Sequence, residues 1–289
     1  MDYTIRPAHR GDTDAIAGFT TDTFEWGDYV PRLFPDWLDD ENGRVMVAVD
    51  ESDTPIALSY GVMLSHNELW LQGARVSEPW RRKGIASALG ETAIDWAAGQ
   101  GAQIARLLTE GWNEPAQRQV ERSGFHRAGD WVMSWRTIAD RAPRISGNGG
   151  QRARAHRKLA IAHSSEAIPA WVSWRSGSLM RPARGLHADG WRWSWLTAEH
   201  LERAGKSGRL WTSRTGWVVT RHESNSLYVD WLECGPEDIG AMLKSIVDLA
   251  EGAGVEEVRI IVPEVEWLTD ALLKGGFDNE PLYLYERPL

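Results

Sequence analysis

The sequence is poor in cysteine, in long apolar runs and in positive charge. Cys234 is the only cysteine of 289 residues, which excludes an intrachain disulfide and a cysteine-rich zinc site. No apolar run approaches the roughly 18 residues that a membrane helix needs, and the first residues, MDYTIRPAHRGD, lack the apolar core of a signal peptide. Basic residues number 32 against 41 acidic ones, a formal net charge of −9. These features predict a cytoplasmic protein with neither a membrane nor a nucleic-acid partner.

The composition is otherwise that of a globular protein. Hydrophobic residues make up 42% and charged residues 25%, and at roughly 150 residues per domain the length predicts about two domains. The eight histidines show no metal-ligand spacing, so no metal is expected. The 17 tryptophans are first of all large core residues, with ligand grooves as the alternative.

The first part of the chain alternates strand and helix patterns, which predict an α/β domain over residues 1–137. A basic, glycine-containing stretch at 138–158 is expected to be a linker, or alternatively a contact for phosphate or an acidic surface. Residues 159–289 repeat the later part of the first domain. Strands are expected at 2–6, 45–50, 55–64, 67–76, 104–109, 131–136, 257–263 and 282–287, and helices at 13–26, 85–98, 115–122, 236–251 and 266–274.

The sharpest local signal is the stretch from Val76 to Ala86, VSEPWRRKGIA. A strand ends, a turn follows and a helix begins at a glycine. The opening turn of a helix offers unpaired N–H groups to an anion, and Gly84 and Ala86 let the backbone come close. Basic side chains from Arg81 to Lys83 add positive charge. The stretch therefore predicts a pyrophosphate-binding loop.

Arg81, Gly84 and Ala86 fill the pattern [Arg/Gln]-x-x-Gly-x-[Gly/Ala], so the first domain resembles the GCN5-related N-acetyltransferase (GNAT) superfamily. The resemblance implies acetyl-CoA as co-substrate, with the fourth strand diverging from its neighbour to admit the cofactor. It also implies a mixed, mostly antiparallel sheet flanked by helices in each of two tandem domains. The residues it assigns to the cofactor are Ala74, Arg75, Val76, Arg81, Arg82, Lys83, Gly84, Ile85, Ala86 and Asn113.

The same resemblance implies chemical roles for two residues. The amide of Val76 would polarise the thioester carbonyl, and Glu110, at the end of the fifth strand, is the first candidate for the base. Glu68 and Glu25 are weaker candidates. Family members often carry a tyrosine acid where this sequence has Val120, so no acid is named.

The second domain departs from the pattern. At an offset of 154 residues, Gly235 stands in place of Arg81, Asp238 in place of Gly84 and Gly240 in place of Ala86. A carboxylate in this loop repels a phosphate. The second domain is therefore expected to be a degenerate copy that binds no CoA and covers or shapes the acceptor pocket.

The acceptor is expected to be a primary amine. An aromatic and acidic segment, with Glu25, Trp26, Asp28 and Tyr29 as substrate-binding candidates, suits a cation. The segment resembles the histidine N-acetyltransferase branch, which suggests a small molecule such as an amino acid. Packing of these aromatics is the alternative. Two other functions stay open: acetylation of a protein amino terminus or lysine, and an acyl-CoA sensor without turnover. A monomer or a homodimer is expected.

Overall fold

The computed structural model describes residues 2–21, 23, 27–138 and 159–289. The chain forms two compact units. Unit 1 comprises Met1–Thr109, Asn113–Ala128 and Leu284–Leu289, and unit 2 comprises Glu110–Trp112 and Gly129–Tyr283. The domain boundaries expected at 137 and 159 stay a prediction, and residues 139–158 of the expected linker lie outside the described residues.

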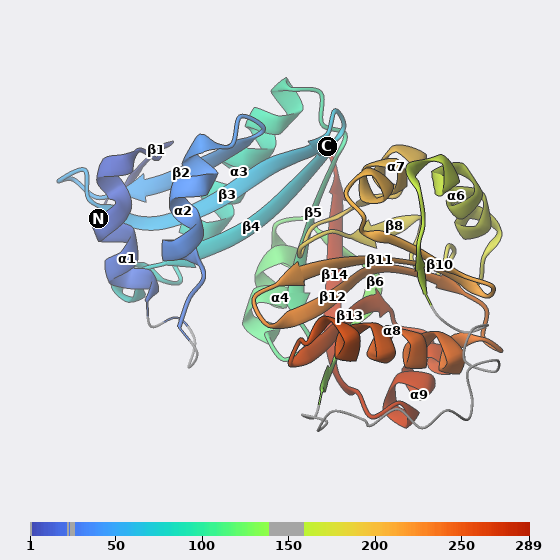
Figure 1. Ribbon diagram of the computed structural model, residues 1–289. Coiled ribbons are helices and arrows are strands. Elements are labelled where there is room, and N and C mark those ends of the chain that lie inside the picture. The colour runs from blue at the N-terminus through green and yellow to red at the C-terminus, as the bar shows by residue number, and fades with distance from the viewer. Residues whose placement is uncertain (1, 22, 24–26, 139–158) are drawn as a thin grey trace. The chain divides into compact units, whose positions relative to one another are not determined.

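Unit 1 is a sheet with helices on both faces. Its strands follow the order β1-β2-β3-β4-β5, and the end of β14 lies next to β5. Helices α1 and α2 lie on one face of the sheet and α3 on the other (Figure 1). The elements are β1 (Thr4–Pro7), α1 (Thr13–Thr20), α2 (Val30–Asp39), β2 (Gly43–Val49), β3 (Pro55–Ser65), β4 (Glu68–Val76), the 3-10 helix η2 (Glu78–Trp80), α3 (Ile85–Gly99), β5 (Ile104–Glu110) and α4 (Glu114–Arg122).

The apolar stripe of α3 holds this helix to the sheet. Ile85 and Leu89 are at most 1% exposed and pack with Met46, Ile56 and Ala57. Burial of such side chains contributes roughly 1.5–3 kcal/mol each, so the start of α3 has a fixed place beside the ends of β2 and β3.

The helical pattern expected at 13–26 is shorter in the structure. Helix α1 ends at Thr20, and α2 begins at Val30 with Pro31 in its first turn, a position where proline needs no N–H partner. Asp28 precedes α2, and its Oδ1 accepts a hydrogen bond from the Val30 N–H at 3.0 Å. The segment expected to face the acceptor therefore connects α1 to a helix that the periodicity did not predict.

Unit 2 has strand order β14-β6-β13-β12-β11-β10-β7, and β8 pairs with β9 apart from that sheet. Helices α6 and α7 lie on one face and α8 and α9 on the other (Figure 1). Strands β6 and β14 each contribute residues to both units. The elements are β6 (His126–Thr137), β7 (Ala160–Ile161), the 3-10 helix η3 (Ser164–Glu166), α6 (Ala167–Ser176), β8 (Leu186–Ala188), β9 (Trp193–Trp195), α7 (Ala198–Lys206), β10 (Leu210–Ser213), β11 (Gly216–Glu223), β12 (Ser226–Cys234), α8 (Ile239–Ala253), β13 (Glu257–Pro263), α9 (Glu266–Lys274) and β14 (Asp278–Pro288).

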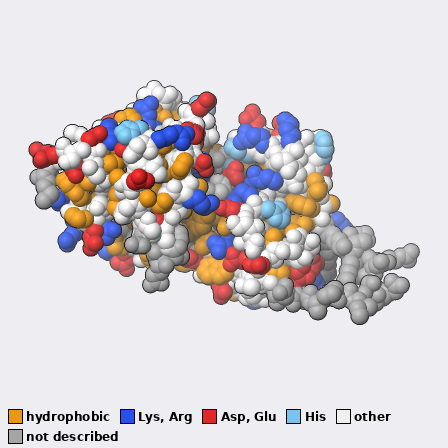
Figure 2. Space-filling model, turned by 60° about the vertical axis from the view of Figure 1, so that its left-hand side comes forward, with side chains coloured by type: hydrophobic (Ala, Val, Ile, Leu, Met, Phe, Trp, Pro, Cys, Tyr) orange, Lys and Arg blue, Asp and Glu red, His pale blue; other side chains and the backbone are white. Residues whose placement is uncertain are grey.

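The fold class is thereby confirmed as mixed α/β with mostly antiparallel pairing. Strands β4 and β5, and β12 and β13, pair in parallel, whereas pairs such as β2–β3 and β11–β12 are antiparallel. No helix among the described residues is long and apolar enough to cross a membrane. Basic and acidic side chains are interspersed over the face shown in Figure 2.

Candidate functional site

The parallel strands β4 and β5 separate after a short paired stretch. Glu68, Leu69 and Trp70 pair with Ile104, Ala105 and Arg106, yet β4 continues to Val76 and β5 to Glu110. Beyond Trp70 the edge of β4 that faces β5 therefore has no ladder partner on that strand. An extended ligand can hydrogen-bond to such an edge as an added strand does.

A β-bulge lies in the separated part of β4. The register on β3 shifts between Leu58 and Tyr60, which pair with Arg75 and Gln72. Gly73 lies in the bulge with φ +69°, and a Cβ there would lie 2.7 Å from a ring atom of Trp37. Only glycine fits both the conformation and the space. A bulge increases the local bend and twist of a strand, and this one lies where β4 leaves β5.

The backbone of Val76 faces away from β3. The N–H of Ser77 donates to the carbonyl of Ile56 at 2.8 Å, and Ala57 and Val76 are opposite residues in the register. Because successive N–H groups of a strand point to opposite sides, the Val76 N–H points to the side of β4 that β5 has left. This is the geometry that an amide needs in order to donate to a carbonyl oxygen lying along β4.

The loop after β4 ends at an open helix terminus. Gly84 caps α3 in the left-handed conformation with φ 77°, and no acidic residue occupies the first turn. The first helical hydrogen bond runs from the Ala88 N–H to the Gly84 carbonyl at 3.0 Å. Within the part of the chain that the structure describes, the amides of Ile85, Ala86 and Ser87 have no hydrogen-bond partner. These N–H groups and the helix dipole are able to bind an anion.

The basic side chains of the loop are exposed, and two of them have defined contacts. Arg81 folds back so that its Nε donates to the carbonyl of Val76 at 3.1 Å. The Lys83 ammonium lies 4.6 Å from the centroid of the Trp80 ring, and Trp80 packs on the core with Val76. Arg82, exposed, has φ 63°. The loop thus carries three cations beside the start of α3.

Two expected ligand residues form an ion pair with each other. The Nε of Arg75 lies 2.6 Å from one carboxylate oxygen of Asp28 and its Nη2 3.2 Å from the other, and the side chains are 14% and 0% exposed. Burial opposes the charged guanidinium, but the hydrogen bond and charge of Asp28, with Tyr29, raise the pKa of Arg75. Asp28 is buried against Arg75, which leaves its carboxylate committed within the protein.

The neighbouring aromatics pack around that pair. Arg75 lies 5.2 Å from the ring centroid of Tyr29, Tyr29 meets Trp37 edge-on at 6.2 Å, and Trp37 stacks on Tyr60 at 4.7 Å. Trp37 is also the side chain that confronts Gly73. The segment before α2 is therefore joined to the β4 bulge through a continuous set of ring and ion-pair contacts.

The remaining expected residues occupy several positions. Asn113 caps α4, its Oδ1 accepting from the Ala116 N–H at 3.3 Å. Glu110 is the last residue of β5, half-buried. Ala74, exposed, belongs to the separated part of β4. Cofactor, substrate and base roles for these residues stay predictions, and Glu25 and Trp26 lie outside the described residues.

Glu68, a weaker candidate for the base, and Val120, at the position of the acid, are the two remaining residues. Glu68 lies at the opposite end of β4 from Val76 and forms a buried ion pair with Arg106 at 2.5 Å, so it is placed away from the separated strands. Val120, where a tyrosine acid is common in the family that the sequence resembles, is 7% exposed within α4.

Unit 2 has a comparable pair of strands with a different loop. Strand β12 pairs with β13 over Ser226–Val229 and then continues to Cys234. Helix α8 follows, capped by Asp238. Burial, with the charges of Glu233, Asp238 and Glu237, raises the pKa of the Cys234 thiol to about 12. A terminus surrounded by carboxylates disfavours an anion, and the thiol stays protonated.

Comparison with known proteins agrees with this geometry. Residues 14–125, less than half of the chain, match the model of the acetyltransferase (GNAT) family. A comparison with curated proteins gave no match.

Solved structures share the fold of nearly the whole chain. A GCN5-related N-acetyltransferase from Sphaerobacter thermophilus superposes with a TM-score of 0.66 at 14% identity, over 99% of this chain and 95% of that one. One from Kribbella flavida gives a TM-score of 0.56 at 15% identity, over 99% and 72%. The glucosamine N-acetyltransferase region of a fungal β-N-acetylglucosaminidase gives 0.67 at 14% identity, over 99% and 38%. At this identity the likeness shows the fold.

Sequence reasoning missed the bulge and the ion pair. The signal for the bulge was an isolated glycine, Gly73, within a strand pattern. The Arg75–Asp28 pair joins residues 47 positions apart, and no local pattern marks such a partner.

Proposed function

We propose that the chain is an acetyl-CoA-dependent N-acetyltransferase that acts on the primary amine of a small molecule such as an amino acid. The observation that carries this proposal is the separation of β4 from β5 directly before the open amino terminus of α3. A strand edge and a helix terminus in this order offer hydrogen bonds first to a pantetheine arm and then to a pyrophosphate. The GNAT match over residues 14–125 supports acetyl-CoA as that ligand.

The proposed chemistry is direct attack of the amine on the thioester. The pyrophosphate binds the amides of Ile85 to Ser87 with Arg81, Arg82 and Lys83 around it. The Val76 N–H donates to the thioester oxygen as negative charge develops there, and Glu110 takes the proton from the amine. Arg81 must leave the Val76 carbonyl, which it contacts at 3.1 Å, in order to reach a phosphate. The thiolate of CoA leaves without a tyrosine acid, since a thiol pKa near 8.5 makes it a tolerable leaving group.

For unit 2 we propose a degenerate tandem copy of the GNAT plan. Helices α3 and α8 have the same length, 15 residues, and each follows a strand that pairs only in part with its parallel neighbour. The Gly84 position of α3 is taken by Asp238 in α8. Unit 2 thereby keeps the scaffold and lacks the anion site.

The test is release of CoA thiol from acetyl-CoA by the full chain, with free amino acids, other small amines and short peptides as acceptors. Gly84→Asp is the test variant and Gly84→Asn its control. Both side chains tolerate the left-handed conformation better than most, and a Cβ at Gly84 meets nothing within 4 Å. The two variants differ in the charge placed before α3.

We expect selective release with a small amine, and acetyl-CoA binding at least about tenfold weaker in Gly84→Asp than in Gly84→Asn. A best substrate among the peptides would move the acceptor to a protein amino terminus or lysine. Tight binding without release from any amine would replace the enzyme with an acyl-CoA sensor. Equal binding by both variants would refute the anion site.

A further inference from the structure

Unit 2 contains a cavity that the acetyl-transfer proposal does not use. It has a volume of about 280 Å³ and is lined by residues of the β8–β9 hairpin, α7 and strands β11 and β12, with Arg209 before β10. Ligand pockets in proteins typically measure about 300–1,000 Å³. The cavity therefore suits a small metabolite, and its polar lining indicates which kind.

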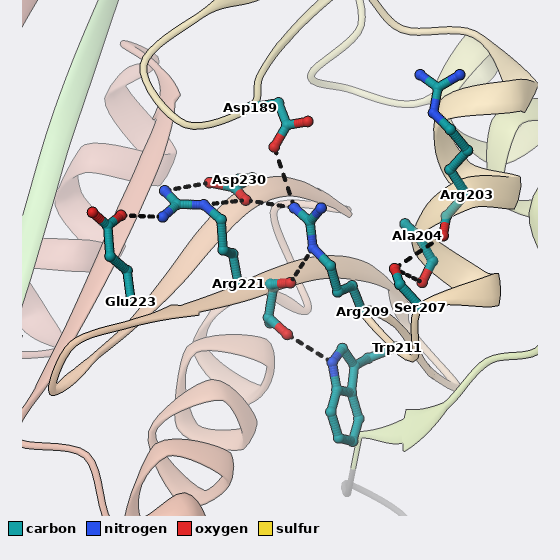
Figure 3. Close-up of polar contacts among 10 residues, drawn as sticks. Asp189, Arg203, Ala204, Ser207, Arg209, Trp211, Arg221, Glu223 and Asp230 are labelled. Atoms are coloured by element: carbon teal, nitrogen blue, oxygen red, sulfur yellow. Dashed lines mark hydrogen bonds and ion pairs between the residues drawn. The ribbon is translucent and has the colours of Figure 1, made fainter. Parts of the chain in front are cut away.

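Most of the charge around the cavity is already paired. Arg209 donates from Nε to the Thr220 carbonyl at 3.0 Å and from Nη2 to Asp230 at 2.9 Å and Asp189 at 3.2 Å (Figure 3). Asp230, with a side chain 1% exposed, also accepts from Arg221. The charge of a buried carboxylate between two guanidinium groups is compensated, so Asp230 is not expected to bind a ligand.

Two charged groups at the cavity have hydrogen-bonding capacity left. Arg203, exposed on α7, has no polar contact from its guanidinium to the described residues, and Figure 3 shows it away from the other charged side chains. Asp189 is 56% exposed and uses one carboxylate oxygen for Arg209. The cavity thus offers a ligand the guanidinium of Arg203 and one carboxylate oxygen of Asp189.

Two histidines, His187 and His200, also line the cavity, and one of them offers a hydrogen-bond acceptor. His187 Nδ1 lies 3.2 Å from the Ser194 carbonyl, so Nδ1 carries the proton and Nε2 is an acceptor. Burial, with the charges of His200 and Arg203, lowers the pKa of His187 to about 4. His200 Nδ1 accepts from the Thr197 N–H at 3.1 Å, and the two imidazole centroids are 4.7 Å apart. The His187 ring is therefore neutral at pH 7.

A simple anion does not match this lining. Two arginines and two aspartates line the cavity, so an anion would meet carboxylates as well as guanidinium groups. A ligand of no net charge that carries both a carboxylate and an ammonium group matches it better. Leu196, Leu201 and Val219 add an apolar wall.

We propose that this cavity binds a small α-amino acid with an apolar side chain. Arg203 donates to the ligand carboxylate, Asp189 and His187 Nε2 accept from its ammonium group, and the side chain lies on the apolar wall. The site belongs to unit 2 and is separate from the loop that we propose for acetyl-CoA. Its occupant is a bound ligand with no bond made or broken.

The test uses L-valine and its two halves, isovalerate, which lacks the amine, and isobutylamine, which lacks the carboxylate. Each is titrated into the full chain while the ring resonances of His187 are followed by NMR. Arg203→Gln is the test variant, and Arg214→Gln, an exposed arginine that does not line the cavity, is the matched control. Gly84→Asp, which changes the loop proposed for acetyl-CoA, tests whether valine binding is independent of acetyl-CoA binding.

We expect valine to shift the His187 resonances at a concentration at least about tenfold below that needed for either half. Arg203→Gln weakens valine binding by about tenfold or more, and Arg214→Gln and Gly84→Asp leave it unchanged. Equal binding of isovalerate and valine would reduce the cavity to an anion site and overturn the proposal. Absence of any shift, or valine binding unchanged in Arg203→Gln, would also overturn it.

Discussion

Replacing Arg75 by methionine tests whether the Arg75–Asp28 pair is structural. The Asp28 side chain is 0% exposed and that of Arg75 14%, and removal of one partner of a buried ion pair costs about 3–5 kcal/mol because it leaves an uncompensated charge. We expect Arg75→Met to approach that range. Asp28→Asn keeps the Val30 contact and leaves a guanidinium that still faces the ring of Tyr29, so it is expected to cost less, about 1–3 kcal/mol.

The double variant Arg75→Met with Asp28→Asn removes both charges and is expected to be more stable than Arg75→Met alone. The matched control is Arg10→Met, because the Arg10–Asp39 pair is equally short, 2.6 Å, but 67% and 64% exposed. Exposed pairs contribute about 0–1 kcal/mol. Urea unfolding, followed by tryptophan fluorescence and circular dichroism, measures all four variants.

Two outcomes would refute this reasoning. One is an Arg75→Met variant as stable as Arg10→Met. The other is a double variant whose loss equals the sum of the two single losses. Weaker acetyl-CoA binding at unchanged stability would instead support the sequence-based prediction of Arg75 as a cofactor ligand.

Two carboxyl groups give further predictions. Burial raises the pKa of Glu233 to about 8 from 4.5, so between pH 4.5 and 8 the unfolded chain loses this proton and the folded chain keeps it. The free energy of unfolding is therefore highest below pH 4.5 and falls between pH 4.5 and 8, by roughly 5 kcal/mol at most. Glu233→Gln is expected to match the wild type in unfolding midpoint at pH 4 and exceed it at pH 8, and equal midpoints at both would contradict this. Glu110→Gln is expected to lower kcat by about 10²–10⁴-fold at neutral pH, with unchanged acetyl-CoA binding and recovery at alkaline pH. An unchanged kcat would remove Glu110 as the base.

Local sequence patterns predicted the helices and strands that bury one apolar face. The helix Glu266–Lys274 and the strand Glu257–Pro263 have the expected bounds, and α3 begins at Ile85 as expected. Their apolar periodicity and glycine boundaries are visible in a short window of sequence. Helix α2 escaped prediction because Pro31 and Pro35 lie within it, and proline usually marks the end of a helix.

The candidate site was predictable where it depends on backbone and on neighbouring residues. Gly84 is left-handed and caps α3, as a loop-to-helix motif requires. The buried ion pair of Asp28 was not predictable, because an exposed carboxylate and a buried, ion-paired one cannot be told apart in sequence. Its partner lies on a strand that the chain reaches only after α2, β2 and β3.

The distribution of β14 between the two units has a consequence for synthesis on the ribosome. Residues 284–289 belong to unit 1, where Arg287 donates to the Ser123 carbonyl at 2.9 Å and the Leu289 N–H to the Gln103 carbonyl at 3.0 Å. Unit 1 therefore cannot complete its sheet until the residues of unit 2 have been translated. Residues 1–128 of the chain emerge with the β5 edge uncovered, a state that favours pairing with other chains. Rapid folding of unit 2, or a chaperone, would shorten that exposure.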